Sequence, residues 1–311
     1  LHLNKFIEGV FFSLDYVGSF LAIHFAHFTL ATKQPAMTAP ALAQKLDNVG
    51  KPEGRAEFVE ETMALIRSQV AAIAGNLAYG RNDTTVIHGP GADLLEVSGG
   101  SSFVVFASEV QEDVTIEGLT ISEGLGRCVS AGGRVTLRDA RITRCAGAAI
   151  DDGLDGIRVT VERSLIDHND GAAIQVGGGP SGAGGLDLAN STVSNNGFGI
   201  AIESGEGPGG LNRIYASTLA DNVSANLSIA IDQRVQIDHT LLKYLPRRGV
   251  DCVLGGTQSL PPGTPNLQSN ASLASDTSCA LFGPRDQEGV DPLLDGLADN
   301  GGPTPTRALS P

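Results

Sequence analysis

A hydrophobic residue recurs behind a short polar opening through the middle of the chain, and this repeat limits the possible folds more than any other feature. The intervals between successive anchor residues are 21, 24, 27, 26 and 22 residues. Another apolar residue lies five positions before each of the first five anchors, and Ile237 lies four positions before the sixth. The anchors are Ile121, Ile142, Ile166, Val193, Leu219 and Leu241, and the residues that precede the first five are Ile116, Leu137, Val161, Leu188 and Ile214.

A third apolar position follows the anchors. Val129, Ile150 and Ile174 lie eight residues after the first three anchors, and Ile202 and Ile231 continue this series if loop insertions are allowed. Three short strands in every period, joined by Gly-rich turns, are typical of a parallel β-helix in which each coil stacks on the one before. We therefore predict an all-β solenoid of about six or more coils, with the anchors in one buried column.

An asparagine follows several anchors at a constant distance. Asn169, Asn196 and Asn222 each lie three residues after an anchor, and Cys145 holds the equivalent place one coil earlier. An inward Asn at a turn hydrogen-bonds backbone groups and the Asn side chains above and below it, which satisfies polar atoms that stacking would bury. We predict an internal ladder of these residues. A ligand site made of the same Asn side chains is the less favoured alternative.

The amino-acid composition changes near residue 80. Residues 1–80 contain 4 of the 5 Lys and both Met, whereas 34 of the 40 Gly come later. The later part carries −13 of the net charge of −14, which disfavours nucleic-acid binding because phosphate contacts need clustered Lys and Arg. The predicted domains are a helical, membrane-associated segment over 1–80, a β-helix over 84–250, and a loop-rich segment over 251–311 that packs on the β-helix or continues it.

The first predicted helix covers residues 9–31, which form a mostly apolar stretch. About 20 such residues are long enough to span a bilayer, and Lys5 and Lys33 flank the stretch where cations are favoured. Asp15 and two histidines inside it count against a lone lipid-facing helix. A buried helix of a soluble domain is the alternative.

Residues 53–79 are predicted to form a second helix, because apolar residues recur there at intervals of three and four. The stripe ends before Gly80, and glycine is a common helix stop. The stripe consists of Val59, Met63, Ile66, Val70, Ile73 and Leu77.

Two strings in this region, HFTLATKQPAMTAPALA (27–43) and IRSQVAAIAGN (66–76), resemble a bacterial membrane family named site-specific recombinase. The resemblance covers residues 1–76 and implies a piece of a protein with several membrane-spanning helices. Strand transfer is not expected, because that chemistry needs a Tyr or Ser nucleophile in an Arg-rich site. Tyr16 lies far in sequence from Arg55 and Arg67.

Two further strings frame the repeat. HGPGADLLEVSGGSSFVVF (88–106) opens it, and DPLLDGLADNGGPTPTRALSP (291–311) closes it. On these strings, residues 84–311 resemble bacterial right-handed β-helix proteins often named choice-of-anchor proteins, which are similar in fold to pectate lyases. The resemblance implies a right-handed helix and an extracytoplasmic or cell-surface location for this part of the chain.

One polar residue per coil follows the third apolar position, and we predict that these residues form an outward-facing row. Glu203 and Asp232 are predicted to lie one rung apart, at about 4.8 Å. The candidate ligand-binding residues are Asp151, Asp152, Gln175, Glu203 and Asp232, of which Asp151, Glu203 and Asp232 are also the candidate catalytic residues.

Chemistry on this row is the alternative to binding. Paired acids hold Ca²⁺ in pectate lyases, and retaining glycosidases need carboxyl groups about 5 Å apart. Gln175 interrupts the acids, and no complete catalytic set occurs at a recognisable spacing. We therefore predict no cofactor and no dedicated metal site, with at most weak Ca²⁺ binding on the acidic face.

The sequence favours a cell-surface β-helix that serves as a binding or adhesion module for a carbohydrate or other surface ligand. The first alternative is a polysaccharide lyase or glycoside hydrolase that acts on the acidic face. An aromatic and basic groove would favour that enzyme, and Phe198 and Tyr215 are the aromatic residues that the repeats offer. The second alternative is a membrane-protein fragment that carries the β-helix as a passenger.

The four cysteines are predicted to form one disulfide. Cys128 and Cys145 are four positions out of phase in the repeat, about 13 Å along an extended chain, whereas a disulfide tolerates a Cα separation of about 7 Å. Both are therefore predicted to be free and buried. Cys252 and Cys279 flank 26 residues of low hydrophobic content, and closing this loop stabilises the fold by about 3–4 kcal/mol in an oxidising compartment. The choice-of-anchor resemblance supports the same pair.

Overall fold

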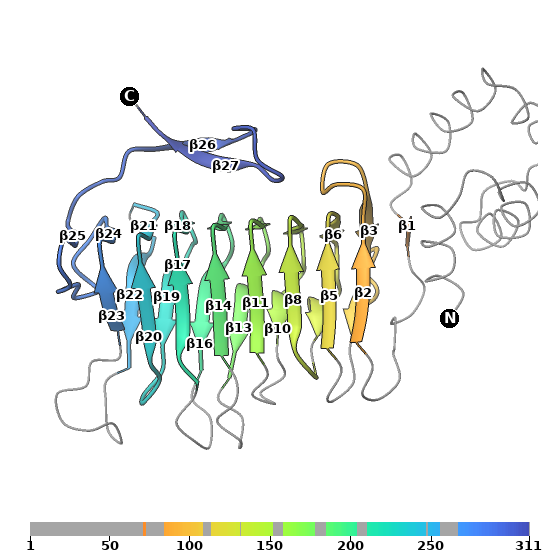
Figure 1. Cartoon of the computed structure of the whole chain (residues 1–311), viewed down its shortest axis with the longest axis horizontal. Helices are drawn as coiled ribbons and strands as arrows, with labels where there is room; N and C mark the ends of the chain where they lie inside the picture. The colour runs from red at the N-terminus through yellow and green to blue at the C-terminus, as the bar shows by residue number, and fades with distance from the viewer. Residues whose placement is uncertain are drawn as a thin grey trace, which may run out of the picture. The chain divides into compact units, whose positions relative to one another are not determined.

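The structure is a computed structural model that describes most of the chain from residue 84 onwards (Figure 1). The described residues are 71–72, 84–107, 113–130, 132–151, 158–177, 185–203, 210–246, 248–255 and 267–310. The chain divides into two compact units, Leu1–Ala74 and Gly75–Pro311. The domain boundaries predicted at residues 80, 84 and 250 stay predictions.

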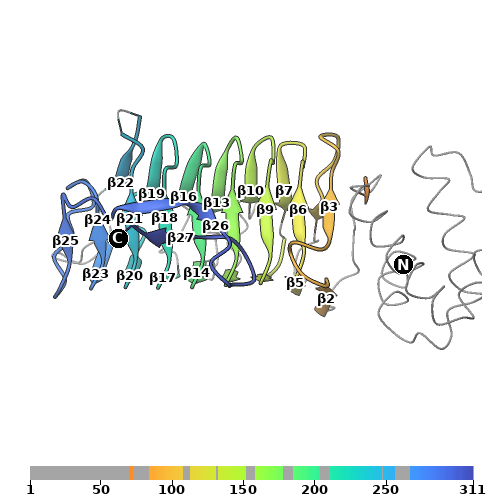
Figure 2. The same cartoon turned by 90° about the horizontal axis from the view of Figure 1, so that it is seen from above.

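The second unit is a parallel β-helix whose coils each place one strand in each of three sheets (Figures 1 and 2). Sheet C has eight strands: β2 (Thr84–His88), β5 (Asp113–Glu117), β8 (Val135–Arg138), β11 (Arg158–Glu162), β14 (Gly185–Ala189), β17 (Asn212–Tyr215), β20 (Val235–Asp238) and β23 (Leu267–Asn270). Sheet A runs through β3 (Glu96–Ser98), β6 (Thr120–Ser122), β9 (Arg141–Thr143), β12 (Leu165–Asp167), β15 (Thr192–Ser194), β18 (Thr218–Ala220), β21 (Leu241–Lys243), β24 (Leu273–Ala274) and β25 (Gln287–Glu288). Sheet B has seven strands: β4 (Phe106–Ala107), β7 (Arg127–Ser130), β10 (Ala148–Asp151), β13 (Ala172–Val176), β16 (Phe198–Ile202), β19 (Ala225–Ile229) and β22 (Val250–Leu254).

Two of the predicted apolar columns are present with a single correction. In sheet C, Ile116, Leu137, Val161, Leu188, Ile214 and Ile237 pair in register as expected. In sheet A the first five anchors also pair in register, but Leu242 rather than Leu241 continues the column from Leu219. Leu241 was the wrong choice between two adjacent leucines. Leu242 lies five residues after Ile237, which restores the interval seen in the other coils.

The third column was predicted correctly only through its first three members. Ile174 pairs with Ile200 and then Leu227, so Ile202 and Ile231 do not occupy this column. Ile202 lies two residues further along the same inward face, and Ile231 is 40% exposed. The sequence prediction allowed for loop insertions after Val193 and after Leu219. Ile200 instead lies seven residues after Val193, and Leu227 lies eight residues after Leu219, so neither coil has an insertion at this turn.

Sharp bends between the sheets are made by single residues with a left-handed backbone. At the bend from sheet C to sheet A, these residues include Asp139, Arg163 and His239, with φ of 47°, 47° and 49°. At the bend from sheet A to sheet B they include Arg144 and His168, with φ of 57° and 54°. One left-handed residue at each bend changes the chain direction within a few residues, so that successive strands belong to different sheets.

The predicted Asn ladder fills the inside of the bend between sheets A and B. The Asn169 backbone N–H and its Nδ2 both donate to Oδ1 of Asn196, at 3.1 and 2.8 Å. Asn196 donates in the same way to Asn222, and Asn222 Nδ2 then donates to Asn226 Oδ1 at 2.8 Å. The chain of donors ends at Oδ1 of Asp251, which is buried. The ladder therefore needs an acceptor at its last position, which the carboxylate supplies.

The prediction that Cys128 and Cys145 are free is wrong, because they form a disulfide with a Cα separation of 5.7 Å. The prediction treated four residues as extended chain, but the chain reverses at the A-to-B bend. Gly124 N donates to Cys128 Sγ at 3.3 Å although the two residues are four positions apart. In a later coil, Asn222 likewise donates to Asn226, which is also four positions away. Cys252 and Cys279 form the second disulfide, which is the pair that the sequence predicts, and no cysteine is free.

The C-terminal residues form an antiparallel hairpin of β26 (Leu294–Ala298) and β27 (Thr306–Leu309). Figures 1 and 2 both place this hairpin over the middle of sheet A. Arg307 forms an ion pair with Asp221 at 2.8 Å and donates to Asn195 Oδ1 at 3.4 Å. Thr304 Oγ1 donates to the Arg163 carbonyl at 3.5 Å.

The helix predicted for residues 9–31 lies outside the described residues. The helix predicted for 53–79 is wrong at Ala71–Ala72, which form strand β1. A short apolar run around these alanines fits a strand as well as a helix, and periodicity does not separate the two. The rest of that segment is outside the described part, and the described residues include no helix that is long and apolar enough to cross a membrane.

Candidate functional site

The polar row predicted on sheet B is only partly present. Ser130, Asp151 and Gln175 pair in register on neighbouring strands. Ala201 and Ser228 continue this row, whereas Glu203 lies beyond the end of β16 and Asp232 lies in the turn before β20, with φ of 62°. The predicted one-rung separation of Glu203 and Asp232 is therefore wrong, for the same reason that Ile202 and Ile231 left the third column.

The described side chains of this row contact one another rather than forming a pair of adjacent acids. Asp151 forms an ion pair with Arg127 at 2.9 Å, and Gln175 Nε2 donates to Glu203 Oε1 at 3.0 Å. Asp152 lies outside the described residues. Gln175 thus lies between the Asp151 and Glu203 carboxylates in the coil order, and the described side chains of this row do not form the two-carboxylate arrangement that a glycosidase uses.

A second polar surface lies on the outer face of sheet A, on strands β3, β9 and β12. Alternate residues of a strand point to opposite faces, so Leu165 and Asp167 point outward when Ile166 points into the column. Leu165 and Asp167 are nevertheless fully buried. The outward residues of the earlier coils, including Arg141 and Glu96, are partly exposed beside them.

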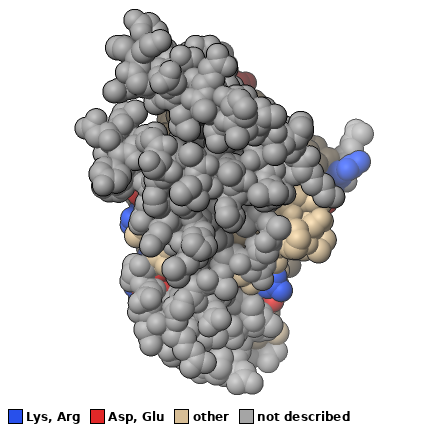
Figure 3. Space-filling view, turned by 90° about the vertical axis from the view of Figure 1, so that its right-hand side faces the viewer, with Lys and Arg blue, Asp and Glu red and all other residues tan. Residues whose placement is uncertain are grey.

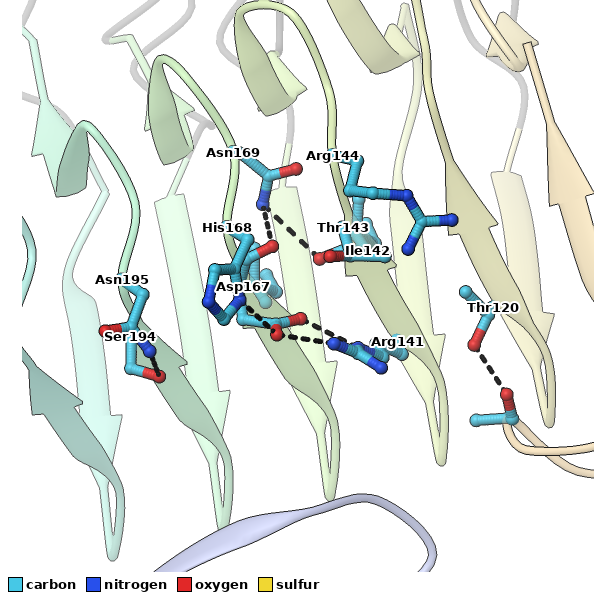
Figure 4. Close-up of polar contacts among 12 residues, drawn as sticks. Thr120, Arg141, Ile142, Thr143, Arg144, Asp167, His168, Asn169, Ser194 and Asn195 are labelled. Carbon is cyan, nitrogen blue, oxygen red and sulfur yellow. Dashed lines mark hydrogen bonds and ion pairs between the residues drawn. The ribbon is translucent and has the colours of Figure 1, made fainter. Parts of the chain in front are cut away.

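Arg141, Asp167 and His168 form the centre of this surface (Figure 4). Arg141 donates to both oxygens of the buried Asp167 carboxylate, at 2.8 and 2.6 Å. His168 Nδ1 lies 2.7 Å from Asp167 Oδ2. The hydrogen bond to Asp167 raises the pKa of Arg141 above its usual range. The carboxylate is therefore neutralised by the guanidinium, and its role is to hold Arg141 and His168 in place.

A second group of charges continues the surface toward the first coil. Arg144 pairs with Glu96 and lies 3.5 Å from Glu123 Oε1. Ser98 donates to Glu123 at 2.8 Å and Ser122 donates to Glu96 at 2.5 Å. Every charge of this group has a partner of opposite sign within the sheet. Where the described surface is visible from the first-coil side, basic and acidic side chains likewise lie next to one another (Figure 3).

A cavity of about 490 Å³ lies at the corner between sheets C and A, where the hairpin turn meets the first coils. One wall consists of residues 88–93, Glu117, Gly118 and Asp139, and the other consists of Asp299 and residues 302–305. Gly89 and Gly118 bring the first two coils together so closely that a Cβ on Gly89 would lie 2.3 Å from the Gly118 carbonyl oxygen. The GPG string thus builds the wall, because only glycine permits this approach.

Acidic side chains dominate the cavity lining. Asp93, Glu117, Asp139 and Asp299 contribute carboxylates, and His88 is the single side chain in the lining that gains a positive charge on protonation. His88 Nδ1 lies 2.6 Å from Glu117 Oε1. Arg163, from outside the cavity, binds both oxygens of Asp139, and its hydrogen bonds hold the pKa of that carboxyl below its usual range. Asp139 is therefore ionised at neutral pH.

Three prolines give this polar cavity an apolar component. Pro90 belongs to the wall of the first coil, and Pro303 and Pro305 belong to the hairpin turn. Hydrophobic surface with a few placed polar groups is typical of small-molecule sites. Within the described part of the chain, no group of three or more His, Cys, Asp or Glu side chains is arranged to hold a metal ion.

Sequence reasoning missed this cavity because Asp139 and Asp299, the nearest members of its two walls, lie 160 residues apart in the chain, and the repeat does not specify where the hairpin folds. The strings HGPGAD and DNGGPTP supplied both walls and were read only as the ends of the repeat. Their shared content of Gly, Pro and Asp is the signal that could have been used. The sheet A surface was missed because the sequence prediction considered only the buried anchors of these strands and not the outward residues beside them.

Comparison with known families gives two matches. A family described as right-handed beta helix region matches residues 69–238, which is more than half of the chain. A family described as site-specific recombinase matches residues 1–88. The two resemblances found in the sequence are therefore confirmed at the level of these families, and the matches overlap at residues 69–88.

One solved structure is similar to this chain, the crystal structure of Dettilon tailspike protein (gp208). The two chains are 11% identical and superpose with a TM-score of 0.30. The similarity covers 74% of this chain and 64% of the tailspike chain. No curated protein sequence matches the chain.

Proposed function

Because the chain belongs to the right-handed beta helix family, we propose that its second unit is a non-catalytic binding module that holds a neutral, hydroxyl-rich ligand such as a saccharide. The observation that supports this proposal is the cavity of about 490 Å³ between the hairpin turn and the first coils. Its volume lies in the range of ordinary small-molecule sites. Its polar lining and its prolines fit a ligand with hydroxyl groups and apolar ring faces.

The charge of the cavity selects among saccharides. The four carboxylates repel an anionic sugar such as a uronate, whereas they accept hydrogen bonds from neutral hydroxyl groups. Hydrogen bonds to an ionised acceptor are stronger than those between neutral groups. A neutral ligand is therefore favoured over an acidic one. Because carboxylates also attract cations, the test must distinguish a neutral ligand from a cationic one.

The contacts of the acids support binding rather than hydrolysis. Glu117 lies against His88, and Asp139 is held ionised by Arg163, so that Asp139 is not set up as a protonated general acid. A glycosidase requires one acid with a raised pKa opposite a second carboxylate. The polysaccharide lyase or hydrolase that was the first alternative receives no support from a specific contact on sheet B or in the cavity.

Two disulfides support a location outside the cytoplasm. Such bonds persist in oxidising compartments and are rare where thiols are kept reduced. We therefore extend the proposal to an extracytoplasmic or cell-surface module that meets its carbohydrate ligand there. Weak Ca²⁺ binding and membrane association of residues 1–80 stay predictions.

Calorimetric titration tests the proposal. The ligands are neutral gluco-oligosaccharides, oligogalacturonate as the acidic control, and spermidine as the cationic control. We expect a neutral oligosaccharide to bind. In Asp299→Asn, which keeps the acceptor for the Gly301 N–H, we expect the affinity to fall about tenfold through loss of one charged acceptor. Glu203→Gln on sheet B is the matched control and should leave binding unchanged.

Binding of oligogalacturonate or spermidine alone would contradict the proposed ligand class. A loss of affinity in Glu203→Gln with none in Asp299→Asn would move the site to sheet B and contradict the proposed location.

A further inference from the structure

One column of outward residues on sheet C leads away from the cavity along the whole β-helix. Its members pair in register on successive strands, beginning with two residues of the cavity wall. Because the strands are parallel and pair in register, equivalent residues of successive coils lie next to one another and the column follows the axis of the β-helix. The column consists of His88, Glu117, Arg138, Glu162, Ala189, Tyr215, Asp238 and Asn270.

The character of this column changes at Ala189. On the cavity side, Arg138 and Glu162 neutralise each other at 2.9 Å. Ala189 is the neighbour of Tyr215 in this column, and its small side chain leaves that side of the Tyr215 ring uncovered. Tyr215 is 49% exposed, so that much of its side chain is accessible from the outer face of sheet C.

The ring of Tyr215 is held in place from its other side. His239 packs against it edge to face, with ring centroids 5.9 Å apart and an interplanar angle of 71°. His239 Nδ1 lies 2.8 Å from Asp238 Oδ1, and Asn270 Nδ2 donates to the same oxygen at 2.9 Å. An exposed aromatic ring fixed by its neighbours loses little conformational entropy on binding, which makes it an effective contact for a ligand.

We propose that Tyr215 and His239 form a second subsite for the same ligand, so that the module binds a linear oligosaccharide along this column rather than a single sugar in the cavity. Four coil spacings separate Glu117 from Tyr215, or about 19 Å. A ligand that fills the cavity and reaches Tyr215 must therefore be extended and several sugar units long. This inference rests on the proposed function of the cavity.

The column suits such a ligand chemically. A sugar ring presents apolar C–H groups on one face, which pack on Tyr215, and hydroxyl groups at its rim, which meet Asp238, His239 and Asn270. The ion pair of Arg138 with Glu162 leaves no unbalanced charge between the two subsites. The stretch in between is therefore compatible with a neutral chain.

Calorimetric titration of the full chain with triose and hexaose forms of maltose-, cellobiose- and laminaribiose-type glucans tests this inference. We expect one hexaose to bind about tenfold more tightly than its triose, which corresponds to one well-placed aromatic contact. Tyr215→Ala should lower the hexaose affinity to that of the triose and leave triose binding unchanged. Tyr215→Phe keeps the ring and should retain the preference, whereas Asp299→Asn should weaken both lengths.

Several outcomes would overturn the inference. Equal affinities for triose and hexaose, with both lowered by Asp299→Asn, would leave the cavity as a binding site and refute the second subsite. A hexaose preference that survives Tyr215→Ala would place the second contact elsewhere. Failure of all six glucans to bind the wild-type chain would contradict the proposed function and this inference together.

Discussion

The β-helix body buries an apolar column on each of its three sheets, whereas the hairpin β26–β27 is held on the outside by Leu294 and a few polar contacts. In the body, each coil is paired with the next along every strand, and the Asn ladder adds a continuous hydrogen-bond chain inside. In the hairpin, Arg307 makes the main anchor, and its Nε is buried without a hydrogen-bond partner. The same unit therefore contains a rigid part and a weakly attached part.

This difference bears on function because the cavity is built from both parts. One wall belongs to the first coils, which cannot move without breaking strand pairs, and the other belongs to the hairpin turn. Weakly stabilised elements are the ones that open locally. We therefore expect the hairpin, and not the coils, to admit the ligand.

The largest effect is expected for the buried column. Ile166→Ala removes a fully buried side chain in the middle of sheet A and should lower the free energy of unfolding by about 2–5 kcal/mol. Ile231→Ala, at the position that was wrongly assigned to the third column, should change it by less than about 0.5 kcal/mol. Urea denaturation measures both, and equal losses would show that Ile231 is buried after all.

The second effect concerns the disulfide that the sequence did not predict. A bond between Cys128 and Cys145 closes a loop with a sequence separation of 17 and should stabilise the body by about 3 kcal/mol. Cys128→Ser with Cys145→Ser should therefore lower the unfolding midpoint in urea. Non-reducing peptide mapping of exported protein should find this bond together with Cys252–Cys279, and modification of Cys128 by a thiol reagent in unreduced protein would contradict it.

A smaller and local effect is expected at the hairpin. Arg307, whose side chain is 7% exposed, pairs with Asp221, which is 19% exposed. Arg307→Ala leaves the Asp221 carboxylate without this partner and should weaken the attachment of the hairpin by about 1–3 kcal/mol.

Limited proteolysis should then cleave residues 291–310 faster in Arg307→Ala, while the urea midpoint of the body stays the same. Arg248→Ala, which removes an exposed arginine that makes none of the hairpin contacts described above, is the control. A fall in the midpoint of the body equal to that of Ile166→Ala would remove the distinction between the two parts.

The smallest effect is a pH dependence at the end of the Asn ladder. Burial raises the pKa of Asp251, although Ser275, the Asp276 backbone N–H and Asn226 all donate to the carboxylate. The folded state then holds the proton more tightly than the unfolded state, so that this group stabilises the fold below about pH 4. The contribution is lost as the pH rises through the folded pKa.

Asp251→Asn should remove this slope. The free energy of unfolding of the wild type, relative to that of the variant, should decrease as the pH is raised from about 4. Urea denaturation of both proteins across this range gives the difference directly. A wild-type advantage that grows with pH would mean that the hydrogen bonds outweigh burial at Asp251.

The sequence predicted those parts of the molecule that repeat. The anchors up to Leu219 and the Asn residues were found because each stacked coil needs the same kind of residue at the same place. Prediction failed where two residues were equally suitable, as with Leu241 and Leu242, and where a turn was shortened, as after Val193. At Leu241 a slip of one residue exchanges the inner and outer faces of the strand, whereas at Ile202 a slip of two residues keeps the inward face but displaces the predicted polar row.

The candidate site could not be predicted in the same way. Cys128 and Cys145 meet across a bend, and the cavity joins His88 to Asp299, so that both depend on how distant segments fold together. A repeat pattern specifies the neighbours of each coil but not the position of a terminal hairpin. The polar row on sheet B was predicted because it follows the repeat, yet Gln175, Ala201 and Ser228 follow Asp151 in register, so that the row contains one acid among the described residues.

Hydrogen–deuterium exchange of the full chain, with and without the neutral oligosaccharide that binds most tightly, tests the central claim most directly. Without ligand, we expect slow exchange in the strands of sheets A and C and fast exchange in the hairpin. With ligand, exchange should slow in two segments far apart in sequence, residues 88–93 and 299–305, which form the two walls of the cavity. Protection confined to β10, β13 and β16 of sheet B, with both cavity walls unchanged, would contradict the account.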